Sequence, residues 1–137
     1  MRNLILVCIM ITSMLLMNGC AADGMQKLSI KKALRDTRAN SKLDRRIRLS
    51  FGKRGGGGRE WTAIRRTNGI NKTTEEACNR AFISALIALQ ERAKKQGRRS
   101  VVGIYSYHKK KVYSSTSRFQ CDDGKMMSAV TLRGKVR

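Results

Sequence analysis

The sequence predicts a small α+β domain, in which a mixed or antiparallel sheet of about five strands packs on one long helix in the chain order ββαβββ. Residues 71–96 carry apolar side chains at helical spacing, and short segments of alternating or β-branched residues lie on both sides of them. The chain has 137 residues, of which 41% are hydrophobic. This composition is sufficient for one domain with a modest core.

Residues 1–19 are predicted to be a lipoprotein-type signal peptide. Arg2 gives the segment a positive start, and residues 4–17 are mostly apolar. A positive start, about 7–15 apolar residues and small residues before a cleavage site are typical of a secretory signal. A transmembrane helix needs about 20 apolar residues, and this run is shorter. A cleaved export signal is therefore favoured, and an uncleaved membrane anchor is the alternative.

Cys20 ends the segment Leu16-Met17-Asn18-Gly19-Cys20, which resembles a bacterial lipobox. In that motif the cysteine thiol is acylated, with chains such as palmitate, and the cysteine becomes the first residue of the mature protein. No aspartate follows Cys20, so the resemblance implies an anchor in the outer membrane that faces the periplasm. The alternative is an ordinary signal peptide, which would leave a soluble periplasmic protein.

Residues 20–44 are predicted to be a basic lead-in ahead of a domain that spans residues 45–137. Leu28, Ala33 and Leu34 are spaced so that they could line a short helix. The polar composition is equally compatible with a tether that reaches from the membrane to the domain.

Two strands are expected before the long helix. In residues 45–51 apolar and polar side chains alternate, which is typical of a strand with one buried face. Residues 55–58 are four glycines, which suit neither a helix interior nor a strand interior. Residues 60–67, which include Trp61 and Ile64, are expected to form the second strand.

Residues 71–96 are expected to form the long helix. Thr73 and Glu76 have the spacing of a capping box, and acidic residues suit the first turn of a helix. Ile83 and Ile87 widen the apolar surface, so we expect the helix to be covered on more than one side. The apolar residues that share one face are Cys78, Phe82, Ala85, Leu86, Leu89 and Ala93.

Three strands are predicted after the helix, at residues 101–107, 112–121 and 126–132, because these segments are rich in β-branched, aromatic or hydroxyl side chains. Lys109-Lys110-Lys111 is expected to connect the first two. Residues 122–125 are expected to form the turn before the last.

The cysteine count predicts one disulfide. Cys8 leaves with the signal peptide and Cys20 carries the lipid, so Cys78 and Cys121 remain as a pair in an oxidising compartment. A bridge between them would join the first turn of the helix to a strand end and stabilise the fold by about 4 kcal/mol. A zinc site is a weak alternative, because two cysteines and His108 at irregular spacing do not make a closed site.

The region around the helix resembles a family of small exported bacterial proteins. The similarity covers about residues 45–134 and is carried by residues 65–93, which contain Ala77-Cys78-Asn79-Arg80-Ala81-Phe82, by the strand at residues 101–107 and by Cys121. Members often carry the label "excinuclease ATPase subunit". More distantly, the arrangement is similar to the outer-membrane sensor lipoprotein of the Rcs envelope-stress system, which has a disulfide-held α/β domain behind a lipidated cysteine.

The sequence does not support the ATPase activity that this label names. A phosphate-binding loop has the pattern Gly-x-x-x-x-Gly-Lys-Ser/Thr, whose backbone amides hold phosphates and whose hydroxyl holds magnesium. The glycine-rich residues 52–58 lack the Lys-Ser/Thr step, and Gly124-Lys125 is followed by Met126. No phosphate-binding loop is therefore expected.

Catalytic and cofactor sites are not predicted either. His108 is the only histidine, and no cysteine or acid lies near it in the sequence to form a triad or a metal site. Met126 and Met127 are interpreted as core filler rather than metal ligands. We expect a protein that is not an enzyme and that has neither cofactor nor metal.

The strongest chemical signal is the charge. The chain has 30 Lys and Arg against 9 Asp and Glu, a formal net charge of +21. Such a surface concentrates polyanions, which in a cell envelope are anionic lipids, lipopolysaccharide phosphates or acidic wall polymers. A solvated surface without a partner is the alternative. The candidate anion-binding residues are Arg45, Arg46, Arg48, Arg65, Arg66, Arg98, Arg99, Lys109, Lys110 and Lys111; Lys94-Lys95 is a further basic pair.

The sequence thus predicts an exported envelope lipoprotein whose basic domain binds an anionic envelope component or a partner protein. A soluble periplasmic binding or stress-sensing module without lipid is the second hypothesis. A nucleic-acid-associated protein, as the family label suggests, is the third. Trp61, Tyr105 and Tyr107 near basic residues are compatible with base stacking, but export would separate the protein from nucleic acid.

Overall fold

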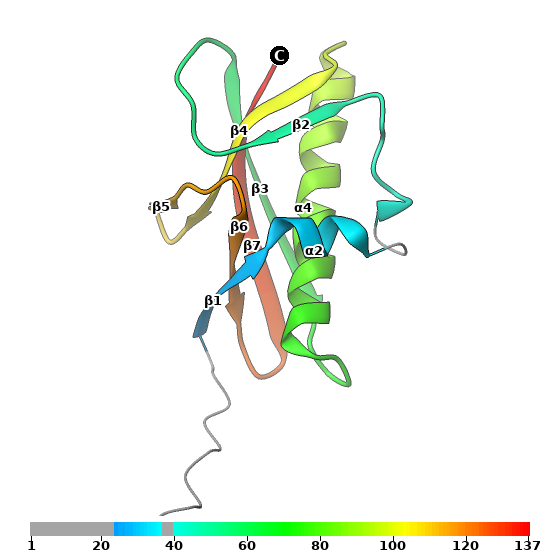
Figure 1. Cartoon of the computed structure of the whole chain (residues 1–137), viewed down its shortest axis with the longest axis vertical. Coiled ribbons are helices and arrows are strands. Elements are labelled where there is room, and N and C mark those ends of the chain that lie inside the picture. The colour runs from blue at the N-terminus through cyan, green and yellow to red at the C-terminus, as the bar shows by residue number, and fades with distance from the viewer. Residues whose placement is uncertain (1–23, 37–39) are drawn as a thin grey trace, which may run out of the picture.

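The computed structural model describes residues 24–36 and 40–137 (Figure 1). The predicted signal peptide at residues 1–19 and the predicted lipidation site Cys20 lie outside the described residues. The elements follow one another in the order β1 (Gly24–Ser29), α2 (Ile30–Arg35), β2 (Arg48–Phe51), β3 (Arg59–Asn68), α4 (Thr74–Lys95), β4 (Ser100–His108), β5 (Lys111–Tyr113), β6 (Arg118–Asp123) and β7 (Met127–Val136).

The predicted fold class is confirmed, since a mixed sheet packs on one long helix and a disulfide joins Cys78 to Cys121. The strand predicted at residues 112–121 is wrong in one respect, because it is two strands, β5 and β6, separated by residues 114–117. There the Ser115 hydroxyl accepts hydrogen bonds from the backbone N–H groups of Ser117 and Arg118. A serine side chain thus takes donors that a continuous strand would use.

The domain begins earlier in the chain than predicted. β1 pairs antiparallel with β6 along its whole length. α2 follows directly and buries Ile30 and Ala33 in the core. Of the three residues expected to line a short helix, Ala33 and Leu34 lie in α2, whereas Leu28 lies in β1. Residues 24–35 pack on the domain and are not a tether outside it. The sequence signal is weak here because β1 is held by backbone pairing with a strand near the other end of the chain.

The sheet is organised around β7. On one edge, β3 pairs antiparallel with β7 along all ten residues. On the other edge, β7 pairs antiparallel with β6 near its start and with β4 near its end. β1 extends the β6 branch, and β2 extends the β4 branch in parallel. The sheet therefore divides into two branches and curls (Figure 1).

α4 covers one face of this sheet. Buried and half-exposed side chains alternate along β7. Its buried positions face the helix, because a Cβ added to Gly134 would lie 3.6 Å from Leu89 of α4 and 2.8 Å from Val101 of β4. The lack of a side chain at Gly134 thus allows α4 to approach the sheet closely. Within the described residues, no helix covers the opposite face.

The three phenylalanines of the chain lie together in the interior. Phe82 of α4 stacks on Phe119 of β6 with ring centroids 4.0 Å apart. Phe51 of β2 lies 6.1 Å from Phe82. Because β2 and β6 belong to different branches of the sheet, the rings join both branches to the same part of α4.

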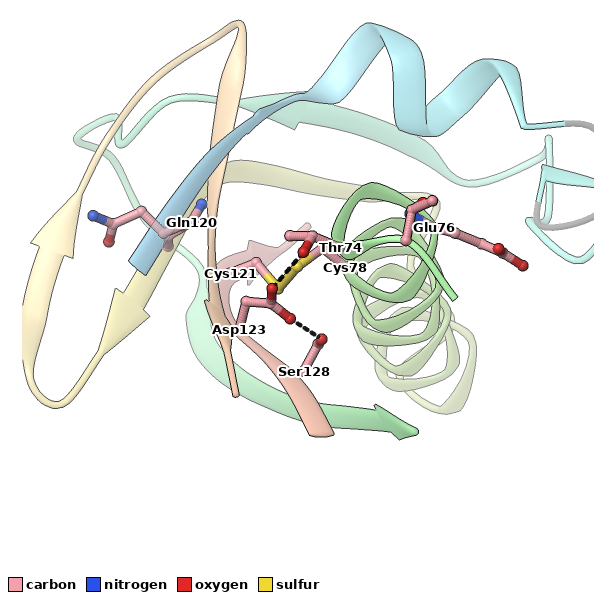
Figure 2. The surroundings of a disulfide bond; sticks show 9 residues. Thr74, Glu76, Cys78, Gln120, Cys121, Asp123 and Ser128 are labelled. Carbon is pink, nitrogen blue, oxygen red and sulfur yellow. Dashed lines mark hydrogen bonds between the residues drawn. A yellow bond between two sulfur atoms is a disulfide. The ribbon is translucent and has the colours of Figure 1, made fainter. Parts of the chain in front are cut away.

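A disulfide fastens the first turns of α4 to β6. Cys78 and Cys121 are fully buried, with their Cα atoms 5.8 Å apart. Beside the bridge, Asp123 accepts hydrogen bonds from the hydroxyls of Thr74 and Ser128, each 2.6 Å long (Figure 2). Thr74 is the first residue of α4, so a covalent contact and a polar contact both hold the start of the helix against the sheet.

We expect the substitution Cys78→Ser to lower the free energy of unfolding by about 2–5 kcal/mol, because the bridge restricts the unfolded chain. The two cysteines are 43 positions apart, so the loop that the bridge closes is long. Urea unfolding measures the loss, and reduction of the wild-type protein should reproduce it. The same unfolding midpoint for the oxidised and the reduced protein would contradict a stabilising bridge.

Candidate functional site

The candidate cations separate into several places in the structure, and five of them come from two adjoining segments. Arg45, Arg46 and Arg48 precede or begin β2, whereas Arg98 and Arg99 immediately precede β4. β2 and β4 pair in parallel. The backbone N–H of Arg48 donates to the carbonyl of Arg99 over 2.9 Å. The two segments therefore lie side by side, next to the point where α4 ends.

A depression of about 680 Å³ lies at this end of the domain. We call its four cations, Arg46, Lys94, Arg98 and Arg99, the basic end. Lys94 was not among the ten anion-binding candidates. The sequence could have indicated it, because Lys94 and Lys95 form a basic pair in the last turn of α4. The depression is lined by Asp44, Arg46, Ile47, Lys94, Gly97, Arg98 and Arg99.

The other candidate residues lie elsewhere. Arg65 and Arg66 are neighbours in β3, so their side chains leave opposite faces of the sheet. Lys109 and Lys110 form the tight turn between β4 and β5, with φ angles of 46° and 65°, and Lys111 begins β5. The ten candidates therefore do not form one continuous surface.

Arg65 belongs to a second basic depression, a groove of about 490 Å³ between β3 and α4. Its other cations are Lys42, Arg92 and Lys95, and Glu91 lies among them. Arg92 packs over the ring of Trp61 at 4.6 Å, on the helix side of the sheet. This groove has four cations and one acid, as the basic end does, but its cations lie among more neutral residues and one of them is held by an aromatic ring.

Gln90 positions one wall of the basic end. This side chain of α4 is only 2% exposed. Its Oε1 accepts a hydrogen bond from the backbone N–H of Asp44, and its Nε2 donates to the carbonyls of Asp44 and Ile47. A buried amide with all of these partners fixes the segment before β2 against the helix.

Asp44 determines the charge balance inside the depression. Its carboxylate accepts two hydrogen bonds from the Arg46 guanidinium, at 3.1 and 3.0 Å, and lies 3.2 Å from Lys94 Nζ. The Arg46 guanidinium, the Arg46 backbone N–H and Lys94 hold the pKa of Asp44 well below its usual range, and desolvation opposes them. A hydrogen bond with Asp44 raises the pKa of Arg46. Hydrogen bonds with Glu91 and, to a smaller extent, with Asp44 raise the pKa of Lys94. Asp44 thus offsets part of the charge of both cations.

All four cations of the basic end are exposed, and Arg98 and Arg99 differ from the other two in their lack of an acidic partner among the described residues. Gly97 ends α4 with a φ of 64°, and the backbone N–H of Arg98 returns to the carbonyl of Ala93. This turn carries both arginines past the end of the helix. Neither of them forms a salt bridge within the part of the chain that the structure describes.

A polar cluster that the sequence did not indicate lies on the sheet face away from α4. Arg133 of β7 packs over the Tyr107 ring at 3.7 Å and donates to the Glu60 carboxylate over 3.3 Å. The Tyr105 hydroxyl donates to the same Glu60 oxygen over 3.1 Å, and burial raises the pKa of Tyr105. These groups pair with one another across β3, β4 and β7, so we assign them a structural role.

His108 has an acidic neighbour in the folded chain. Its Nε2, at the end of β4, lies 3.3 Å from Asp122 Oδ2 in β6. No acid lies near this histidine in the sequence, but the sheet brings it beside an acid from another strand. Among residues 24–36 and 40–137, no three histidine, cysteine, aspartate or glutamate side chains are placed to hold a metal ion. In the same ranges, no helix has the length and apolar character needed to cross a membrane.

No protein-family model matches this sequence, and no curated protein or solved structure matches it either. The resemblance to the exported family thus stays a prediction, and the function has to be inferred from the residues and geometry of this chain.

Asp44 should make the stability of the domain depend on pH. Its pKa in the folded protein lies below the ordinary value of 3.8. The contribution of Asp44 to the free energy of unfolding is therefore fully present above that value and is lost as the pH falls through the folded pKa. We expect the urea unfolding midpoint of the wild-type protein to decline as the pH is lowered below about 4. The midpoint of the Asp44→Asn variant should decline less over the same pH range. Parallel pH profiles for the two proteins would contradict this role of Asp44.

Proposed function

We propose that the protein is an exported lipoprotein of the bacterial cell envelope, that it acts by binding rather than by catalysis, and that its basic end binds anionic groups of an envelope component. The observation that supports this most is the convergence of cations. Arg46 precedes β2, whereas Arg98 and Arg99 precede β4, and all three line one depression with Lys94 of α4.

The side chains of the basic end suit phosphate and carboxylate ligands. A guanidinium is planar, always charged and able to bind either group through two hydrogen bonds. Arg98 and Arg99 are exposed and have no acidic partner among the residues that the structure describes, so they are the proposed first contacts. Arg46 and Lys94 share Asp44, which keeps them ordered along the wall of the depression. The proposed ligand is a polyanion with closely spaced phosphate or carboxylate groups.

The buried disulfide supports export, because disulfides form and persist in oxidising compartments such as the bacterial periplasm. It agrees with the predicted signal peptide at residues 1–19. It also leaves Cys20 as the one cysteine of the mature chain without a disulfide partner, as acylation would require.

A palmitate label tests the anchor against the alternative of a soluble periplasmic protein. We expect cells that produce the full chain to incorporate labelled palmitate into it and to retain it in membranes. Cys20→Ala should abolish both, whereas Cys78→Ser should still be labelled. Unlabelled protein in the soluble periplasm would favour the alternative, and an intact chain in the cytosol would contradict export.

The basic end is tested by a pair of charge-matched variants. Arg98→Gln combined with Arg99→Gln should weaken the binding of inorganic polyphosphate. It should also lower the slope of log Kd against log salt by about 1–2, because a protein that makes fewer phosphate contacts releases fewer counterions when it binds. Lys109→Gln combined with Lys110→Gln removes the same charge at the β4–β5 turn and should have a smaller effect. Equal losses in both variants would contradict a defined site.

A further inference from the structure

Exposed apolar side chains gather at the end of the domain opposite the basic end. Among the described residues, six large hydrophobic side chains are exposed, and four of them belong to three segments that meet at this end. These segments are the start of β1, the loop between β3 and α4, and the turn between β6 and β7, whereas the basic end lies where α4 stops (Figure 1). We call the four side chains the methionine end: Met25, Ile70, Met126 and Met127.

Backbone contacts hold the β3–α4 loop and the β6–β7 turn together. The N–H of Gly69 donates to the carbonyl of Met126 over 3.0 Å. Met127 lies opposite Asn68 in the β3–β7 ladder. The side chain of Asn68 accepts a hydrogen bond from the N–H of Ile70 over 2.7 Å. The apolar side chains are therefore presented by an ordered surface.

The sheet register places Met25 on the same side as a cation. Met25 lies opposite Asp122, Asp122 opposite Ala129, and Ala129 opposite Arg66. Residues that are directly opposite in neighbouring strands share a face of the sheet. This row thus crosses four strands on the face that α4 does not cover, with an exposed methionine at one edge and an exposed arginine at the other.

The methionines are exposed to an extent that a core role does not explain. Met126 is 67% exposed, Met127 51% and Met25 40%, and these are all the methionines of the described residues. The interpretation of Met126 and Met127 as core filler is therefore wrong. Single exposed apolar residues are common, but a group of them marks a contact surface, and flexible methionine side chains adapt to irregular partners.

Cations and acids both border this apolar surface. Lys72 donates to the carbonyl of Asn68 over 2.9 Å, and Lys125 precedes Met126 in the β6–β7 turn. Asp123 accepts from two hydroxyls, Asp122 lies next to His108, and Glu75 lies 3.8 Å from Lys32. Apolar side chains bordered by lysine and arginine are typical of surfaces that lie on anionic lipid headgroups.

The length of chain between Cys20 and the domain indicates which surface meets this end. β1 begins at Gly24, four residues after Cys20. Four residues span at most about 14 Å. A lipid on Cys20 would therefore bring the start of β1, and with it the methionine end, to the bilayer.

We propose that the methionine end docks on the lipid surface in which the protein is anchored, with its four apolar side chains in the interface and the neighbouring cations at the headgroups. This orientation rests on the proposed acylation of Cys20. It also restricts the partner of the basic end. α4 has 22 residues and runs between the two ends, a length of about 33 Å, whereas charges are screened over about 8 Å at physiological salt. The polyanion bound by the basic end therefore lies away from the anchoring membrane surface.

Tryptophan reporters at two exposed apolar positions test the docking. The lipidated protein with Trp61→Phe is reconstituted in vesicles of phosphatidylethanolamine and phosphatidylglycerol, some with brominated acyl chains. Met126→Trp should show blue-shifted emission that the brominated lipids quench. Val112→Trp, at an exposed position in β5, should show neither effect. Equal emission and equal quenching at the two positions would overturn the proposal.

Serine variants in the Met126→Trp protein separate docking from proximity to the anchor. Changing Met25, Ile70 and Met127 to serine should abolish the quenching. Changing Ile64 and Val112 to serine should leave the quenching intact; these are the other two large hydrophobic side chains that are exposed in the described part of the chain. Quenching that survives in the first variant would overturn the proposal. So would a dimer, detected by sedimentation without lipid, that the first variant dissociates, since a second copy would then cover this end.

Polyphosphate binding by the same samples reports on the basic end separately. Loss of polyphosphate binding with quenching retained would remove the proposed ligand of the basic end and leave the docking in place. Loss of quenching with polyphosphate binding retained would remove the docking alone.

Discussion

The attachment of α4 to β6 is the contact on which the rest of the structure depends. The disulfide between Cys78 and Cys121, the stacked rings of Phe82 and Phe119 and the hydrogen bond from Thr74 to Asp123 all join the N-terminal half of the helix to this one strand. β6 lies between β1 and β7, so fixing α4 to β6 also fixes the N-terminal strand and the central strand of the sheet. In an oxidising compartment this bridge would compensate for the small core of a short domain, because it restricts the unfolded chain rather than adding buried surface.

The orientation of α4 then separates two surfaces of different chemistry. Its C-terminal end carries a depression with four cations, two of which share Asp44, while its N-terminal end lies beside exposed methionines and Ile70. A single rigid helix therefore keeps a proposed polyanion site and a proposed lipid contact apart by more than the screening length of charges in solution. If both proposals hold, the domain is a short rigid spacer, held to a membrane at one end and able to bind an anionic component at the other.

The elements that the sequence predicted well are those with a strong local pattern. The long helix was predicted from its periodicity and capping box, and Thr73 does accept a hydrogen bond from the N–H of Glu76. The elements that it predicted poorly depend on distant partners. β1 has little pattern of its own and exists because β6 offers an edge, and the strand expected at residues 112–121 is divided because Ser115 binds backbone donors. The same limit applies to the candidate site, because the fold brings Lys94 of α4 next to Asp44, a residue 50 positions earlier whose backbone the buried Gln90 holds in place.

The sequence by itself determined the fold class, the long helix and the pairing of Cys78 with Cys121, because periodicity, capping and cysteine count are properties of a linear chain. It also determined the total charge. Only the tertiary structure decided how that charge is distributed, since Arg46 and Arg98 are brought together by the pairing of β2 with β4. It likewise decided that Met126 and Met127 are exposed. Local sequence specifies which face of an element is apolar, but which faces become covered depends on contacts between segments that are far apart in the chain.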